Sequence, residues 1–198
     1  MIPLLRWLLP LITLLLAACG QTTHSAHFVS TDITGANFGR DFALTDDTGH
    51  LRHLSDYKGK AVVLFFGYTQ CPDVCPTTLA GLAAAMKLLG TDAKRVQVLF
   101  VTVDPERDTQ ALLAAYVPQF DPSFVGLYSD PATTAATAKE FKIFYQKVAG
   151  STPQTYTIDH TASSYAYDPQ GRLRLLIRHE ETPQNIAHDL KLLLAGTE

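Results

Sequence analysis

Two cysteines, Cys71 and Cys75, stand four positions apart in the stretch VVLFFGYTQCPDVCP. Side chains at positions i and i+4 can face the same point in a helical or turn geometry. Two thiolates placed in this way can form a disulfide, exchange it with another thiol, or bind a soft metal ion. The pair is therefore the candidate redox and metal-ligating site of the chain.

Two structural roles for the pair stay open as alternatives. A structural disulfide is the usual role of paired cysteines in exported proteins, but so small a loop would constrain little of the unfolded chain. A structural zinc site normally takes four protein ligands, and the only other cysteine, Cys19, lies ahead of the expected folded domain. Adding an imidazole would instead give two sulfurs and one nitrogen, a donor set that suits copper.

His160 is the candidate for that imidazole. It follows the segment TYTI in what is expected to be a loop, and Asp159 and Thr161 flank it. These neighbours could orient the ring through its second nitrogen, as a metal-ligating histidine usually requires. Spacing alone cannot bring His160 to the cysteines, so an ordinary loop histidine remains the alternative.

The cysteines lie between a predicted strand and a predicted helix. The apolar run Val62–Phe66 favours a strand buried on both faces, and Gly67 ends it. Each cysteine precedes a proline, which disfavours helical torsions, so both are expected in a turn-like loop. Pro76 suits a first helical position, and the free N–H groups at that helix start would favour thiolate over thiol.

A second apolar run, Val96–Val103, follows this helix, and the strand–helix–strand spacing predicts parallel neighbouring strands. Asp104 and Pro105 come directly after it, at the edge where open α/β sheets bind ligands. We expect this loop to lie near the cysteines, with Asp104 contacting the ligand residues without binding the metal itself. A turn or cap ahead of a helix at Gln110–Phe120 is the alternative role for Asp104.

Two hairpins and two further helices complete the expected α/β fold. The turn Asp46–Gly49 joins Phe38–Leu44 to His50–Leu54 in an N-terminal hairpin. The remaining elements are expected at Phe124–Tyr128 (strand), Pro131–Phe141 (helix), Ile143–Val148 (extended), Ser163–Tyr167 and Leu173–Ile177 (a second hairpin), and after Thr182 (a helix with Ile186, Leu190, Leu193 and Leu194 on one face).

The N-terminus predicts export and anchoring. Arg6 precedes an apolar run, Trp7–Leu16, that is too short for an ordinary spanning helix, and the sequence Leu-Ala-Ala-Cys ends it at Cys19. This resembles a bacterial lipobox, in which Cys19 is lipidated and becomes the first mature residue; a plain signal peptide is the alternative. The expected organisation is a lipoprotein signal peptide (1–18), a lipidated cysteine and flexible tether (19–37), and one folded domain (38–198).

Composition excludes one class of partner and permits a substantial core. The 198 residues carry a formal net charge of −3 and no cluster of lysine or arginine, so nucleic acid is not an expected partner. Hydrophobic residues make up 46% of the chain, which is enough to build a core without a disulfide.

Three motifs together resemble the Sco/SenC family of membrane-anchored copper proteins. They are FFGYTQCPDVCPTTL, VTVDPERDT and YTIDHTASSYAYDPQGR, in the family's order and in register from about Phe42 to the C-terminal helix. The resemblance implies a thioredoxin-like fold, a central mixed sheet flanked by helices, with an added N-terminal β-hairpin. It also implies one copper ion, Cu(I) or Cu(II), per chain, held by Cys71, Cys75 and His160, and it matches Asp104 to the family's Asp-Pro loop.

The resemblance further implies a role in assembling the binuclear copper centre of cytochrome c oxidase. The expected function is a metallochaperone that delivers copper to the oxidase's copper-centre subunit, lipid-anchored on the extracytoplasmic, bacterial periplasmic side of a membrane. Other copper chaperones or thiol reductants are further expected partners. Many relatives keep an uncleaved transmembrane helix, so the lipidated cysteine is a departure.

The alternative to a metallochaperone is an enzyme. Cys71 and Cys75 could be the catalytic dithiol of a thiol–disulfide oxidoreductase that keeps the target's cysteines reduced. That activity needs no third ligand, so His160 discriminates the two functions. A peroxidase is disfavoured, because the loop that carries the cysteines supplies no activating arginine.

Overall fold

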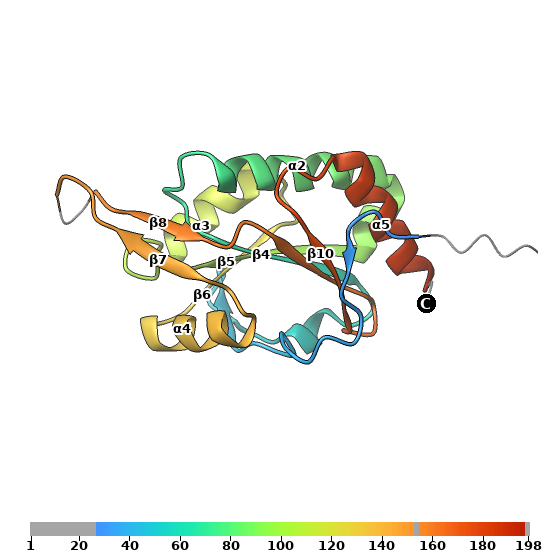
Figure 1. Ribbon diagram of the computed structural model, residues 1–198, viewed down its shortest axis with the longest axis horizontal. Coiled ribbons are helices and arrows are strands. Elements are labelled where there is room, and N and C mark those ends of the chain that lie inside the picture. The colour runs from blue at the N-terminus through green and yellow to red at the C-terminus, as the bar shows by residue number, and fades with distance from the viewer. Residues whose placement is uncertain (1–26, 153–154, 197–198) are drawn as a thin grey trace, which may run out of the picture.

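The computed structural model describes residues 27–152 and 155–196, which form a mixed sheet flanked by helices (Figure 1). The strands of the main sheet are β1 (Thr31–Asp32), β2 (Leu44–Asp46), β3 (Leu51–Arg52), β4 (Ala61–Gly67), β5 (Val96–Thr102), β6 (Val125–Tyr128), β9 (Ser164–Tyr167) and β10 (Leu173–Ile177). A separate two-stranded sheet contains β7 (Tyr145–Val148) and β8 (Thr157–His160). The helices are α2 (Val74–Leu89), α3 (Gln110–Tyr116), α4 (Pro131–Glu140) and α5 (Pro183–Ala195), with 3-10 turns η1 (Leu54–Tyr57), η2 (Gly90–Arg95) and η3 (Val117–Gln119).

The centre of the main sheet is the parallel pair β4 and β5, and every residue of both strands is buried. This confirms the two buried strands predicted from the apolar runs. The strand order is β1-β10-β9-β4-β5-β6-β2-β3, in which β6 is parallel to β5 and β9 is antiparallel to β4. The sheet is therefore mixed, as expected.

Helices cover both faces of the sheet. Figure 1 shows α2 and α5 together on one side and α4 on the other. The predicted apolar face of α5 is buried, and Thr182 caps this helix by accepting a hydrogen bond from the Asn185 N–H. Within the described residues, α2 continued through η2 to Arg95 is the one helix whose length and apolar composition would suit a membrane span. It is a core helix here, because Leu79, Leu82 and other residues of one side are buried within the fold.

The N-terminal hairpin is confirmed in a shorter form than expected. Strands β2 and β3 pair antiparallel, whereas residues 38–43 form no strand. The Asp46 carboxylate closes the turn by accepting hydrogen bonds from the backbone N–H groups of Thr48 and His50 and from Arg52 Nε. The polar turn signal in the sequence therefore has a direct structural role.

The folded region begins before Phe38, within residues expected to be tether. Strand β1 pairs with β10, and the buried Asp189 carboxylate accepts hydrogen bonds from the N–H groups of Val29 and Ser30 at 2.8 and 2.7 Å. Hydrogen bonds to the buried carboxylate and to β10 help to hold this segment, and its mostly polar composition gave no sign of them. The predicted signal peptide and Cys19 lie outside the described residues.

Candidate metal centre

The two cysteines lie on either side of a helix start. Cys71 is in the loop of residues 68–73 that follows β4, here called the cysteine loop. Cys75 is the second residue of α2, which corrects the expectation that both cysteines lie in a loop. A proline in the first helical turn is tolerated because the N–H it lacks would have no intrahelical acceptor. The Cys75 N–H points to the Cys71 sulfur at 3.4 Å, and both thiols are free.

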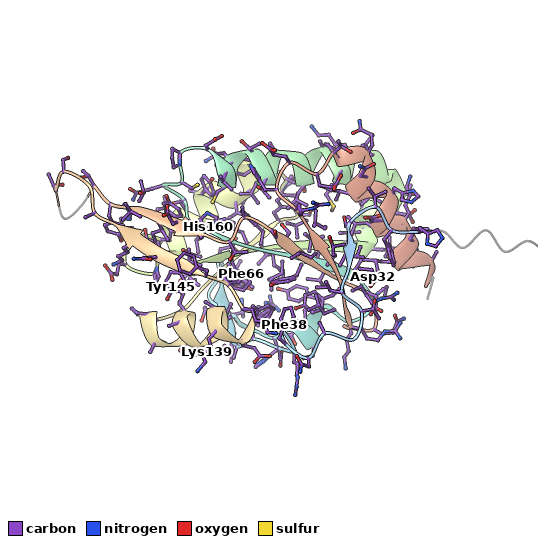
Figure 2. All side chains as sticks on the ribbon, viewed as in Figure 1. Asp32, Phe38, Phe66, Lys139, Tyr145 and His160 are labelled. Carbon is purple, nitrogen blue, oxygen red and sulfur yellow. The ribbon has the colours of Figure 1, made fainter. Side chains whose placement is uncertain are left out.

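His160 is brought to the same point by the pair β7 and β8, here called the histidine hairpin. It is the last residue of β8 and pairs with Tyr145, so it belongs to a strand and not to a loop (Figure 2). Its Nε2 lies 3.4 Å from the Cys75 sulfur, and its Nδ1 lies 3.0 Å from the Thr161 carbonyl oxygen. When Nδ1–H donates to that carbonyl, the lone pair of Nε2 points toward the thiols, which is the tautomer that a metal ligand needs.

The three side chains form one group that could hold a metal ion, here called the ligand set. Their sulfur and nitrogen atoms all lie within 4.8 Å of one another, and no other group of this kind occurs within residues 27–152 and 155–196. A pocket of about 380 Å³ opens onto the set, and Tyr68 and Asp73 are among its lining residues. Cys71 and His160 are half-buried whereas Cys75 is fully buried, so the ligand set is open on one side. Two sulfurs and one imidazole nitrogen suit a soft metal ion such as copper(I).

The two thiols have opposite electrostatic environments. The Cys75 thiol, placed to donate to the Cys71 sulfur, lowers the pKa of Cys71 to about 4, with His160 and nearby backbone N–H groups adding to the effect against partial burial. The same contact with Cys71, together with deep burial, raises the pKa of Cys75. One thiolate therefore exists at neutral pH beside one protonated thiol, which is consistent with the reactivity predicted from the helix start.

Alkylation should separate the two thiols. In the reduced, metal-free protein at pH 6, iodoacetamide should modify Cys71 much faster than Cys75, because a free cysteine with a pKa of about 8.5 would be almost wholly protonated there. Because deprotonation creates the nucleophile, the Cys71 rate should rise with pH around a midpoint several units below 8.5. Mass spectrometry of the modified peptides measures both rates. A midpoint at or above 8.5 for both cysteines would contradict this expectation.

Asp104 lies close to the site but does not contact the cysteines. Its buried carboxylate accepts hydrogen bonds from Arg107 Nε at 2.5 Å and from the Tyr156 hydroxyl at 2.6 Å. It does not cap α3, because Thr109 does so by accepting from the N–H of Leu112. Asp104 thus connects the loop after β5 to the segment that leads into β8.

Asp159, the other residue expected to support the ligands, lies at the pocket rim with an exposed side chain. The acceptor for His160 Nδ1 is the Thr161 carbonyl, so the backbone fixes the ring orientation. Of the two predicted neighbours of the histidine, Thr161 has the orienting contact.

The structure adds Asp108, which sequence reasoning missed. This buried carboxylate accepts hydrogen bonds from the Thr69 N–H at 3.0 Å, the Thr69 hydroxyl at 2.6 Å and the Thr102 hydroxyl at 2.6 Å. Burial raises its pKa. Asp108 therefore joins the cysteine loop to the end of β5, and its place in the motif VTVDPERDT was the one available signal.

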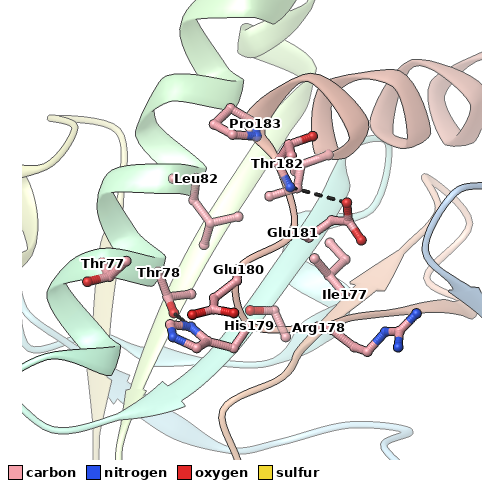
Figure 3. A pocket seen from close by; sticks show the side chains of 13 residues that line it. Thr77, Thr78, Leu82, Ile177, Arg178, His179, Glu180, Glu181, Thr182 and Pro183 are labelled. Carbon is pink, nitrogen blue, oxygen red and sulfur yellow. Dashed lines mark hydrogen bonds between the residues drawn. The ribbon is translucent and has the colours of Figure 1, made fainter.

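A second pocket lies between the first turns of α2 and the connection from β10 to α5 (Figure 3). His179 Nδ1 and the Thr78 hydroxyl are hydrogen-bonded in its wall at 3.0 Å. None of the predicted site residues lines this pocket. The ligand set and the pocket above it are thus the candidate functional site.

Comparisons with known proteins identify a family of similar sequences. The SCO1/SenC family model matches residues 30–195. An SCO2-like protein from Rickettsia felis is 32% identical over 154 residues, which are 77% of this chain and 75% of that protein. The mitochondrial SCO2 homolog from Bos taurus is 38% identical over 133 residues, which are 66% of this chain but 50% of that protein. The chain thus spans only half the length of the bovine relative.

A solved structure supports the same relationship. Bradyrhizobium japonicum ScoI with copper bound is 41% identical, has a TM-score of 0.72, and is matched over 79% of this chain and 98% of that one. The similarity confirms the expected thioredoxin-like fold, with its central mixed sheet between helices.

Proposed function

Because the chain belongs to the SCO1/SenC family, we propose that it binds one copper ion through Cys71, Cys75 and His160 and delivers it during cytochrome c oxidase assembly. The observation that carries the proposal is the gathering of three soft or borderline ligand atoms within 4.8 Å, from segments 85 residues apart. The similar ScoI structure holds copper, and Sco proteins are described as a family of cytochrome c oxidase assembly proteins. The proposed recipient is the copper-centre subunit of that oxidase.

The asymmetry of the site suits release as well as binding. Cys71 and His160 border the open pocket, whereas Cys75 is buried behind them. A three-ligand site with an open side allows a thiolate or imidazole of the recipient to add before a ligand of this chain leaves. Copper is the cargo in this step, and the low pKa of Cys71 means that no proton has to leave that ligand at neutral pH.

Removing either thiolate tests the proposal. Cys71→Ser and Cys75→Ser should each weaken copper(I) binding by several orders of magnitude, since a hydroxyl is a poor ligand for this soft ion. Competition against a copper(I) chelator, on the reduced protein, gives the affinity. Oxidation of wild type to the Cys71–Cys75 disulfide is a matched control, and it should also abolish binding. Copper(I) affinity retained in both serine variants would contradict the proposed site.

A thiol–disulfide oxidoreductase is the second candidate, because a thiolate at Cys71 stands beside a protonated thiol at Cys75. Cys71 would attack one sulfur of a target disulfide and release the other as a thiolate. Cys75, on losing its proton to solvent, would then attack the mixed disulfide. The target would leave as a dithiol, and the Cys71–Cys75 disulfide would need an external thiol reductant. This cycle needs no third ligand, and His160 would contribute to it only by helping to lower the pKa of Cys71.

The proposed location is the periplasmic side of a bacterial membrane, with a lipid on Cys19. Cys19→Ala should remove lipid attachment, so the variant should leave the membrane fraction or remain an unprocessed precursor. Radiolabelled fatty acid and cell fractionation, with wild type as the control, measure this outcome. Normal processing and unchanged membrane partition of Cys19→Ala would exclude a lipid anchor at this residue.

A further inference from the structure

We propose that the loop of residues 103–109 fixes the position of His160 relative to Cys71 and Cys75. In this proposal Tyr156 holds the histidine hairpin against the loop as a lock. The inference rests on the proposed copper site for its importance, but its contacts belong to the metal-free chain. One end of the loop holds the hairpin that carries His160, and the other end holds the cysteine loop.

The histidine hairpin needs such a lock. Its strands β7 and β8 pair only with each other and are not part of the main sheet, so no strand ladder fixes them relative to β4 and α2 (Figure 1). Any displacement of the hairpin would move His160 away from Cys75. Ligand sets tolerate displacements of only about 0.5 Å before their geometry is lost.

Tyr156, just before β8, makes three contacts with the loop of residues 103–109. Its hydroxyl donates to Asp104 Oδ1 at 2.6 Å, and its carbonyl oxygen accepts from Arg107 Nη1 at 2.9 Å. The Arg107 guanidinium also lies over the Tyr156 ring, 3.6 Å from the ring centre. Asp104 and Arg107 form an ion pair with each other, so a single ion pair bonds both the side-chain hydroxyl and the backbone carbonyl of Tyr156.

Burial makes this lock stronger than the ion pair on the outer side of the hairpin. Asp104 is fully buried and the Arg107 side chain is only 15% exposed, so the pair is shielded from solvent. The contact between Lys147 and Glu106 is mostly exposed, and such pairs contribute little. The hairpin also contacts the core through the hydrogen bond from the Ile158 N–H to the Tyr68 hydroxyl, through the buried Ile158 side chain, and through His160 beside Cys75.

The opposite end of the loop holds the cysteines. Asp108 accepts two hydrogen bonds from Thr69, two residues before Cys71, and Arg107 Nη1 reaches Gln70 Oε1 at 3.2 Å. The loop is itself fixed to the end of β4 by the hydrogen bond from the Val103 N–H to the Gly67 carbonyl. The cysteine loop and the histidine hairpin are therefore both held by the same short segment, residues 103–109.

Tyr156→Phe tests the lock in the metal-free protein. Losing a hydrogen bond to a buried carboxylate should accelerate amide hydrogen exchange across Thr157–His160 by about tenfold to a hundredfold. NMR contacts of the His160 ring with the rings of Tyr68 and Phe65, now 5.8 and 6.1 Å apart between centres, should weaken. Copper(II) affinity should fall by about tenfold to a hundredfold, as for other residues that orient a ligand.

Two further variants sharpen the test. Tyr167→Phe removes a hydroxyl that donates to the Gly39 carbonyl at 2.7 Å, and it should leave both the hairpin exchange and the copper(II) affinity unchanged. Arg107→Lys keeps the positive charge but loses the forked geometry, so it should act in the same direction as Tyr156→Phe.

Three results would overturn the proposal. They are wild-type exchange in the hairpin of Tyr156→Phe, an equal change in Tyr167→Phe, or an accelerated hairpin with unchanged copper(II) affinity. Failure of wild type to bind copper would instead overturn the proposed function. The exchange measurements would still decide whether Tyr156 positions His160.

Discussion

Replacing His160 with alanine is expected to weaken copper(II) binding by at least about a hundredfold, since even residues that only orient a ligand are worth about ten- to a hundredfold. Copper(I) binding should fall by less, because copper(I) accepts two thiolate ligands and the variant keeps Cys71 and Cys75. Copper(II) prefers a fuller set that includes nitrogen. The imidazole Nε2, 3.4 Å from the Cys75 sulfur, is the one nitrogen among the three ligand atoms of this set.

Two titrations on the same protein measure this difference. Copper(II) affinity can be followed by the thiolate-to-copper absorption, and copper(I) affinity by competition with a chelator. His179→Ala is a matched control, because His179 is also half-buried and bonded near the start of α2, to the hydroxyl of Thr78. It should change neither affinity. Equal losses for both copper ions in His160→Ala would contradict the assigned role of the imidazole.

Oxidase assembly in cells carrying His160→Ala separates the two proposed functions. Copper delivery predicts that assembly fails at limiting copper and recovers when copper is added. A thiol reductase predicts normal assembly, because Cys71 and Cys75 can still cycle between dithiol and disulfide. Normal assembly at limiting copper, with both cysteines still required, would exclude delivery as the function.

The parts of the fold that the sequence predicted are those in which neighbouring residues carry the signal. A strand buried on both faces needs a continuous apolar run, so β4 and β5 were visible in the chain. Strand β1 was not, because it has two exposed polar residues and depends on β10 and on hydrogen bonds to Asp189. The helical position of Cys75 was missed because a preference against helix before proline yields at a first turn.

The site divides in the same way. The cysteines are four residues apart, so local geometry alone indicated that they could act together. The contact of His160 with Cys75 spans 85 residues and depends on how the whole chain closes, so only the resemblance to a family supplied it. Tyr156 and Asp108 act through buried polar contacts, which leave no hydrophobic periodicity in the sequence.

Gly67→Ala is expected to damage both the core and the site. A Cβ at this position would lie 2.7 Å from the Cys75 sulfur, 2.9 Å from the Phe100 ring and 3.2 Å from the Phe65 ring. All three neighbours are fully buried, so none can move aside freely. Overpacking of this kind costs about 1–3 kcal/mol of the free energy of unfolding. Displacement of Cys75 should also weaken its contact with Cys71 and raise the pKa of Cys71 above its value of about 4.

Gly81→Ala supplies the matched control, because Gly81 lies within α2 and nothing lies within 4 Å of an added Cβ there. That substitution should leave the site intact and raise stability by about 0.5–1 kcal/mol, since alanine favours a helix over glycine. Urea unfolding of both variants shows whether each substitution lowers or raises the free energy of unfolding, and alkylation rates measured against pH give the pKa of Cys71. If Gly67→Ala kept wild-type stability and the same pKa of Cys71, the close packing of β4 against Cys75 would not be what holds that thiol in the ligand set.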